Sequence, residues 1–165
     1  MKKLAVNMEY VRRHLFTVVV TLALAVWFAY DGFVVYPATP AAELYVAIEK
    51  SDPPAAFDLD AFKTQKIRTQ ISFSALSLLA FLVVGLRLLS SVKFDFSYDE
   101  EGFVLKGSRY SYADISSVDR ARWSAKGVAL LKLKDGNKII LDSWHHRGVD
   151  EFLKSLPESL NQEGV

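Results

Sequence analysis

The chain has 165 residues, a formal net charge of +1 at pH 7 and no cysteine. Without cysteine it can form no disulfide, no thiolate nucleophile and no cysteine-ligated zinc or iron–sulfur cluster. The nearly balanced charge gives no overall field that would attract a polyanion, so we expect no nucleic-acid partner.

Two uncharged apolar segments dominate the first half of the chain. They are Leu15–Tyr30 (LFTVVVTLALAVWFAY) and Ile71–Leu86 (ISFSALSLLAFLVVGL). With their apolar flanks, Leu15–Tyr36 and Ile71–Leu89 are long enough to cross a hydrocarbon core of ~30 Å at ~1.5 Å per residue. We therefore expect residues 1–90 to form a short lead-in and a two-helix transmembrane hairpin.

Residues 1–14 precede the first apolar segment and predict a short amphipathic lead-in that lies on the bilayer surface. The apolar residues of this lead-in are Leu4, Val6, Met8, Tyr10 and Val11. Lysines before an apolar run also occur in cleaved secretory signals. However, this apolar run is longer than a signal's, and aromatic residues crowd its far end, which predicts a permanent span.

The basic residues at the ends of the spans predict the orientation. Six flank the end of the hairpin that carries both termini: Lys2, Lys3, Arg12, Arg13, Arg87 and Lys93. Four lie in the loop at residues 37–70: Lys50, Lys63, Lys66 and Arg68. By the positive-inside rule we expect a multi-pass protein of the bacterial inner (plasma) membrane, with both termini in the cytoplasm and the loop outside. The three loop charges just before the second span oppose this orientation.

Small side chains recur every fourth residue along the first span, at Thr17, Thr21, Ala25 and Ala29. Small residues let a second helix approach closely, so this face is a predicted docking face for the second span or for a partner's helix. The alternative is ordinary membrane composition, in which alanine and threonine are common.

Asp31 lies near the outer end of the first span. A carboxylate inside a membrane is costly and often functional, which makes Asp31 a candidate intramembrane polar site. The alternative, which we favour, is a position at the outer headgroup level, where the side chain is hydrated.

The loop between the spans is not disordered in composition. Ala41–Lys50 predicts a short helix that Ser51–Pro54 ends, and a second helix from about Ala61 continues into the second span. A structured outer loop is a candidate partner-binding element, and the alternative is a packed connector.

The pattern changes to short β-type segments in residues 91–165. Alternating or β-forming segments lie at 93–98, 102–106, 109–112, 116–123, 128–134 and 138–141. Asp135-Gly-Asn137 predicts a hairpin turn, and helical spacing begins at Val149. The predicted fold class is an α+β membrane protein: a two-helix transmembrane hairpin (1–90) plus a small antiparallel β half-barrel capped by a C-terminal helix (91–165).

The order of these elements, with Asp-Glu-Glu-Gly-Phe103, Tyr112-Ala-Asp-Ile115 and Lys134-Asp-Gly136, resembles the bacterial pleckstrin-homology-like (PH-like) domains. The resemblance covers about Phe94–Leu160. Many of these domains follow a pair of membrane spans on the cytoplasmic side, so the resemblance implies a membrane-anchored interaction module. The bacterial group has no shared catalytic or ligand motif, so no functional residue is carried over.

No pattern in the chain predicts chemistry. The adjacent His145 and His146 would point to opposite faces of a strand, and His14 is distant, so we expect no metal site. Nucleophile-elbow, phosphate-loop and HExxH motifs are lacking in the sequence. We therefore predict a protein that is not an enzyme and that has no catalytic residues and no cofactor.

Basic residues of the β-region form a candidate lipid-headgroup face: Arg120, Arg122, Lys132, Lys134 and Lys138. Interleaved acidic residues leave a simple solvated sheet face as the alternative. Three functions follow from the sequence. The first is an accessory or assembly subunit of a larger membrane complex, with other membrane subunits, lipid or a second copy as partners. The others are a lipid-headgroup sensor and a non-catalytic transporter subunit that uses Asp31.

Overall fold

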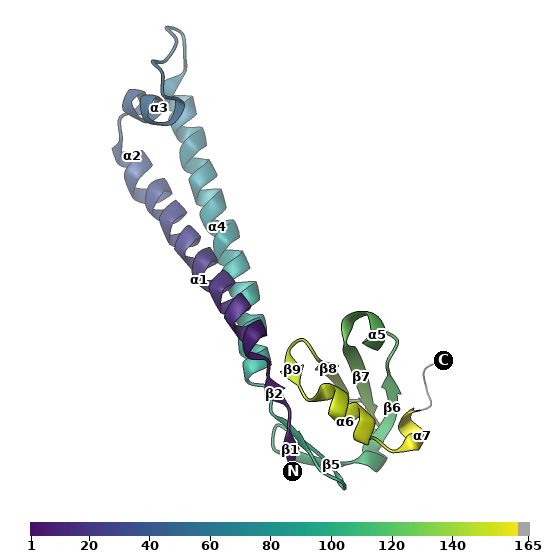
Figure 1. Cartoon of the computed structure of the whole chain (residues 1–165). Helices are drawn as coiled ribbons and strands as arrows, with labels where there is room; N and C mark the ends of the chain where they lie inside the picture. The colour runs from purple at the N-terminus through teal and green to yellow at the C-terminus, as the bar shows by residue number, and fades with distance from the viewer. Residues whose placement is uncertain (162–165) are drawn as a thin grey trace. The chain divides into compact units, whose positions relative to one another are not determined.

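The computed structural model describes residues 1–161, and the chain divides into two compact units (Figure 1). The first, which we call the hairpin unit, is His14–Arg87. The second, which we call the β-unit, combines Met1–Arg13 with the chain from Leu88 onward. The N-terminal residues thus belong with the β-unit, although the sequence analysis grouped them with the spans.

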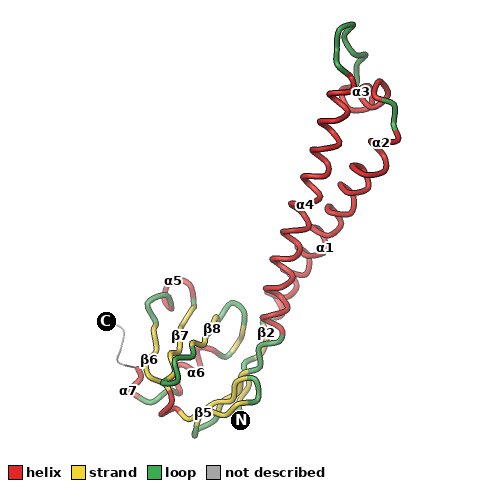
Figure 2. The backbone as a smooth tube through the Cα atoms, turned by 180° about the vertical axis from the view of Figure 1, so that it is seen from behind, coloured by secondary structure: helices red, strands yellow, loops and turns green. Residues whose placement is uncertain are grey.

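Helices make up the hairpin unit (Figure 2). In chain order the elements are α1 (Met8–Tyr30), a π-helical turn (Asp31–Val35), α2 (Tyr36–Ala38), α3 (Ala41–Glu49) and α4 (Leu59–Val92). Within the described residues, two helical stretches, Met8–Ala38 and Leu59–Val92, are long and apolar enough to cross a membrane. Only 11% and 6% of their most apolar windows are buried, whereas a core helix of a soluble protein would be mostly buried.

The two long helices pack through a seam with alternating spacings of three and four residues. The less exposed positions on the first side of the seam include Val18, Thr21, Ala25 and Phe28 of α1 and Gly32 of the π-helical turn. In α4 they include Ile67, Gln70, Ser74, Ser77, Phe81 and Val84. This average spacing of ~3.5 residues is the one that keeps a seam facing its partner in a coiled coil. The Ser74 hydroxyl donates to the Ala25 carbonyl oxygen at 2.9 Å, which fixes the register of the pair.

Gly32 is buried where α1 gives way to the π-helical turn. A Cβ atom built on it would lie 3.0 Å from Cγ1 of Ile71 and 3.2 Å from the backbone nitrogen of Ile71. Pro37 follows five residues later; its ring has no N–H and would clash with the carbonyl four residues before it, so a widened turn is expected there. The glycine therefore permits the close approach of α4.

We expect Gly32→Ala to destabilise the helix pair by about 1 kcal/mol, because the added methyl group meets backbone that cannot move freely. Gly85→Ala is the matched control: nothing lies within 4 Å of a Cβ at Gly85. It should be neutral or stabilising, since alanine has the higher helix propensity. Unfolding in mixed detergent micelles measures both variants, and equal effects would contradict the close packing at Gly32.

The loop between the long helices is folded. Tyr45 of α3 contacts the rings of Phe57 and Phe62 at centroid distances of 4.8 and 5.0 Å. The Lys63 ammonium group donates to the carbonyl oxygens of Pro37 and Thr39 at 2.9 and 2.7 Å. The short helix predicted over Ala41–Lys50 is confirmed as α3, and the loop is a packed cap on its helices.

The β-unit contains antiparallel strands in three small sheets (Figures 1 and 2). The first sheet has the order β1 (Lys2–Lys3), β3 (Phe96–Tyr98), β4 (Gly102–Leu105) and β5 (Ser108–Ser111). The second sheet pairs β2 (Ala5–Val6) with β9 (His146–Arg147). The third sheet has the order β6 (Ile115–Asp119), β7 (Val128–Leu133) and β8 (Lys138–Asp142). Its helices are α5 (Trp123–Lys126), α6 (Val149–Ser155) and α7 (Glu158–Asn161), and a 3₁₀ turn spans Tyr112–Asp114. The α+β class with two long apolar helices and antiparallel sheets is thus confirmed.

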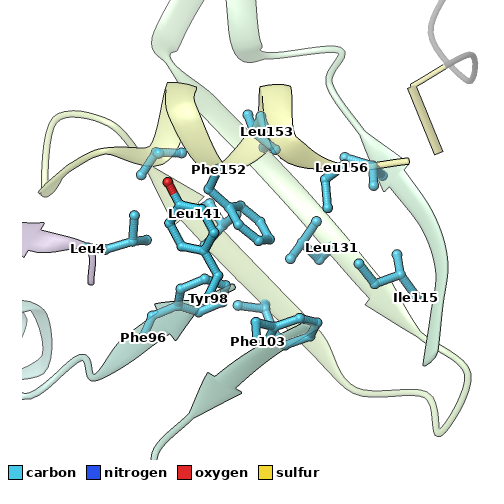
Figure 3. Close-up of a cluster of buried hydrophobic side chains, with 14 of the residues drawn as sticks. Leu4, Phe96, Tyr98, Phe103, Ile115, Leu131, Leu141, Phe152, Leu153 and Leu156 are labelled. Carbon is cyan, nitrogen blue, oxygen red and sulfur yellow. The ribbon is translucent and has the colours of Figure 1, made fainter. Parts of the chain in front are cut away.

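Helix α6 closes the core of the β-unit (Figure 3). Phe152 is fully buried and lies edge-on to Phe96 at 4.9 Å and to Tyr98 at 5.0 Å. Phe103 stacks on Phe96 at 5.3 Å. The helical spacing predicted from Val149 is confirmed, and α6 ends before Pro157, as a proline there requires.

The N-terminal segment completes this core, which the sequence analysis did not anticipate. Leu4 is 2% exposed and belongs to the buried cluster, and its backbone N–H donates to the Phe96 carbonyl oxygen at 3.0 Å. Lys2 and Lys3 pair with Tyr98 and Ser97 of β3. The segment is therefore extended over residues 2–6, whereas an amphipathic lead-in was expected.

Candidate functional site

A group of bonded polar side chains in the β-unit lies where the first turns of α1 and the last turn of α4 meet the β8–β9 loop. We call it the histidine cluster; it consists of Tyr10, Ser91, Asp142, His145 and His146. The loop is held there by Asn7, whose backbone N–H donates to the His145 carbonyl oxygen at 2.8 Å. The cluster therefore joins three segments that are far apart in the sequence.

His146 is the buried member of the pair, with 5% of its surface exposed. Its Nε2 atom lies 3.0 Å from the Ser91 carbonyl oxygen, which can only accept, so we assign the proton to Nε2. The ring of Phe94 lies 4.6 Å away. The Ser91 carbonyl oxygen, in the last turn of α4, also accepts the Phe94 backbone N–H at 3.4 Å.

His145 faces the other side of the cluster. Its Nδ1 lies 3.5 Å from the Ser91 hydroxyl, its Nε2 lies 3.6 Å from the Asp142 carboxylate, and its ring contacts that of Tyr10 at 4.3 Å. The His145 and His146 rings are 6.2 Å apart and nearly perpendicular. Among the described residues, no three histidine or acidic side chains could hold a metal ion together.

The His145 ring lies between a hydroxyl, that of Ser91, and a carboxylate, that of Asp142, as the imidazole of a catalytic relay does. The distances of 3.5 and 3.6 Å are those of a structural contact. Ser91 is 5% exposed. The Asp142 carboxylate also accepts the backbone N–H of Trp144 at 2.8 Å, which fixes the loop as an Asx turn. The arrangement thus ties the helix ends to the β8–β9 loop.

Sequence reasoning missed this cluster because its members are separated by up to 136 positions in the chain, from Tyr10 to His146. The available signal was the triplet Trp144–His145–His146, three ring-bearing residues that follow Asp142 and Ser143. Such a turn needs packing partners, but the sequence does not say which segment supplies them.

The predicted docking face on α1 is used only in part within the hairpin. Ala25 is buried, Thr21 and Ala29 are half-buried, and Thr17 is exposed. A repeat of four residues rotates by about 40° at each step around a helix of 3.6 residues per turn, so its ends leave the seam. The α4 helix packs on the middle of the ladder.

Asp31 is half-buried at the beginning of the π-helical turn. Its carboxylate accepts the indole N–H of Trp27 at 2.9 Å. The neighbouring Gly32 faces Gln70 and Ile71, at the level where α4 changes from apolar to polar residues. Asp31 thus lies at the end of the apolar stretch, and its functional role stays a prediction.

Of the five basic residues proposed as a lipid face, four are exposed and Arg120 is half-buried. Lys132 and Lys138 are directly opposite each other on β7 and β8, and both are exposed. Lys134 and Arg122 are exposed in the connections after β7 and before α5. Arg120 is different: its guanidinium donates to the Leu153 carbonyl oxygen at 3.0 Å and so holds α6 against the sheet.

A groove of about 850 Å³ lies beside the N-terminal strand and is lined by Met1, Lys2, Tyr98, Asp99, Glu100, Glu101, Arg109 and Ser155. The Arg109 guanidinium contacts the carboxylates of Asp99 and Glu101 at 3.3 and 2.9 Å, so its charge is already compensated. At its edge the Tyr112 hydroxyl donates to the Asp99 carbonyl oxygen at 2.6 Å.

Tyr98 and Tyr112, at this groove, predict that the β-unit loses stability at alkaline pH. Burial raises the pKa of Tyr112, with a further increase from Asp99 and a partial decrease from a hydrogen bond with Ser155. Burial also raises the pKa of Tyr98, as does the charge of Glu151. A phenol whose folded pKa exceeds the unfolded value of ~10 stabilises the fold below pH 10, and this contribution is lost as the pH rises through the folded pKa.

We therefore expect the free energy of unfolding of the β-unit to fall above about pH 10. Tyr112→Phe should make this fall shallower and, by removing the hydrogen bond to Asp99, should cost about 1 kcal/mol at neutral pH. Denaturant midpoints measured from pH 8 to pH 11 test this, with Tyr30→Phe in α1 as the matched control. An unchanged pH slope in Tyr112→Phe would contradict the assignment.

No protein-family model, curated protein or solved structure matches this chain. The resemblance to the PH-like domains therefore rests on the sequence pattern alone and stays a prediction.

Proposed function

We propose that the chain is a multi-pass membrane protein whose β-unit binds other subunits of a membrane complex. The membrane assignment rests on α1 and α4, whose most apolar windows are almost unburied. Permanent retention of α1 is supported by Leu4 and Tyr10, which are 2% and 0% exposed in the β-unit. Cleavage after an N-terminal signal would remove both side chains from the core.

The pairing of β1 with β3 supports the proposed topology. If both long helices cross the bilayer, the residues before α1 and after α4 must lie on the same side to share one sheet. The positive-inside rule then favours the cytoplasm for both termini and the exterior for the loop that carries α3.

We also propose that the β-unit is PH-like. The proposal is supported by the succession of short antiparallel strands β3 to β9, followed by α6 with its buried Phe152. In the bacterial PH-like proteins that the sequence resembles, such a domain serves as an interaction module, which agrees with a binding role and not a catalytic one.

The observation that carries the proposed function is the outer face of the sheet β6–β7–β8. Ile140 is 60% exposed at its centre, directly opposite the half-buried Leu130. Next along the strands, Lys132 and Lys138 are opposite each other, and in residues 1–161 neither ammonium group has a salt bridge. Like charges opposed on a sheet are destabilising, so an acidic, partly apolar partner surface would relieve a cost present in the free protein.

The test is gentle extraction of the tagged chain from its native membrane, followed by mass measurement of the intact particle. We expect partner subunits in fixed ratio, and their loss in the variant Ile140→Asp/Lys132→Glu. Ser108→Glu, an exposed change on β5, is the matched control and should keep the partners. A particle that contains only this chain in wild type would contradict the proposal.

A second candidate, binding of anionic lipid headgroups, is favoured by the same Lys132–Lys138 pair. It predicts that backbone amides of β7 and β8 exchange hydrogen more slowly in nanodiscs with anionic lipid than in neutral ones. The difference should disappear at high salt and in Lys132→Glu/Lys138→Glu, because screening and charge reversal both remove the attraction. Equal exchange rates in both lipids would exclude this candidate.

A further inference from the structure

Trp144 is the most unusual exposed side chain of the β-unit. It lies in the β8–β9 loop with 45% of its surface exposed, although a large aromatic ring gains much by burial. The loop around it is not loose. The backbone N–H of Trp144 donates to the Asp142 carboxylate at 2.8 Å, and the carbonyl oxygen of Trp144 accepts from the Asn7 side chain at 2.9 Å. The exposed ring is therefore carried by a turn that hydrogen bonds hold in place.

The ring is also held beside the start of the first apolar helix. The Arg13 guanidinium lies over the Trp144 ring, 5.5 Å from its centroid. Arg13 is two residues before Leu15, where the uncharged segment of α1 begins, and α1 is continuous from Met8. One turn of helix advances ~5.4 Å, so the contact lies within about one turn of the first apolar residue.

The last turn of α4 also carries exposed apolar side chains followed by a cation. Leu89 and Val92 are 54% and 50% exposed, and Lys93 follows them. This turn is bonded to β9, which directly follows the same loop, by the contact of His146 with the Ser91 carbonyl oxygen. The start of α1, the end of α4 and the β8–β9 loop of the β-unit thus carry exposed apolar side chains and cations.

This combination matches the chemistry of the bilayer interface. Indole rings concentrate at the headgroup level, where the apolar body meets acyl chains and the N–H meets polar groups. An arginine at that level keeps its stem in apolar surroundings and its guanidinium among polar groups, and the Arg13 guanidinium also contacts the Glu9 carboxylate. We propose that Trp144, with Arg13, is a lipid-interface anchor that holds the β8–β9 loop of the β-unit in the headgroup layer.

The occupant of this surface is the bilayer and not a second protein, because Arg13 comes just before the apolar stretch of α1 in the chain and Val92 comes just after that of α4. The inference rests on the proposed function, in which these helices span the membrane. It adds a contact between the folded β-unit and lipid that the spans by themselves do not require.

Tryptophan fluorescence of the full chain in vesicles tests the anchor, with lipids brominated near the headgroup as the quencher. The chain has three tryptophans: Trp27, in the first apolar segment and 64% exposed, Trp123 of α5, which packs against the core, and Trp144. We compare wild type with Trp27→Phe and with Trp27→Phe/Trp144→Phe. Both changes replace exposed rings conservatively, so folding should be kept, which circular dichroism checks.

We expect bromine near the headgroup to quench Trp27→Phe, and this quenching to be lost in the double variant, in which only Trp123 remains. Quenching of wild type without quenching of Trp27→Phe would overturn the anchor while keeping the membrane assignment, since Trp27 then reports insertion. Wild type without any quenching would overturn the membrane assignment itself and the anchor with it.

Discussion

Leu4→Ala is expected to lower the free energy of unfolding of the β-unit by about 2–5 kcal/mol, the range for leucine truncation in a packed core. Leu4 is 2% exposed among Phe96, Phe152 and their neighbours (Figure 3), and its backbone bonds to the Phe96 carbonyl oxygen. The effect is unusual because Leu4 precedes an apolar helix and would ordinarily be treated as part of a flexible leader.

Hydrogen exchange of the β3 and β9 amides in the full chain, in detergent, measures this loss. A cost of 2 kcal/mol corresponds to about a thirty-fold faster exchange of amides that open by global unfolding. Met8→Ala is the matched control, since Met8 is 69% exposed and also precedes the apolar segment. Exchange in Leu4→Ala that equals exchange in Met8→Ala would show that the N-terminal segment is not part of the core.

Gly102→Ala is expected to cost about 3 kcal/mol, at the upper end of the range for overpacking. A Cβ atom at Gly102 would lie 2.1 Å from the Tyr110 carbonyl oxygen and 3.1 Å from Cα of Ser111. Because these are backbone atoms of the paired strand β5, no rotamer change can relieve the clash, and β4 and β5 must separate there.

Gly136→Ala provides a graded comparison. Gly136 has a φ of +87° in the β7–β8 turn, but nothing lies within 4 Å of its Cβ position. Alanine there suffers only the left-handed backbone penalty of about 1–2 kcal/mol. Thermal unfolding of both variants should rank Gly102→Ala as the less stable, and the reverse order would contradict the strand pairing at Gly102.

The long elements were predictable because their signals are local. Uncharged segments of 16 residues predicted both apolar helices, and Asp135-Gly-Asn137 predicted the turn between β7 and β8, where the Asp135 carboxylate accepts the backbone N–H of Asn137. The spacing from Val149 predicted α6, and Ala41–Glu49 is the short helix expected in the loop. Each depends on neighbours within a few residues.

The remaining features depend on partners that no local pattern identifies. Strands β1, β2 and β9 have two residues each, too short to show a period of two. Arg120 looked like a surface cation, yet it bonds to a carbonyl 33 residues away. The four-residue ladder of α1 suggested one docking face, whereas a seam needs an average spacing of ~3.5 residues.

The central claim is that α1 and α4 cross a membrane and return the chain to one β-unit on a single side. Because the chain has no cysteine, single cysteines report topology cleanly. We would introduce Lys3→Cys, Ala55→Cys and Lys138→Cys one at a time and label membrane vesicles of known orientation with an impermeant maleimide. The account predicts that Lys3→Cys and Lys138→Cys react from the same side and Ala55→Cys from the opposite side. Labelling of all three from one side, or of Lys3→Cys and Lys138→Cys from opposite sides, would contradict it.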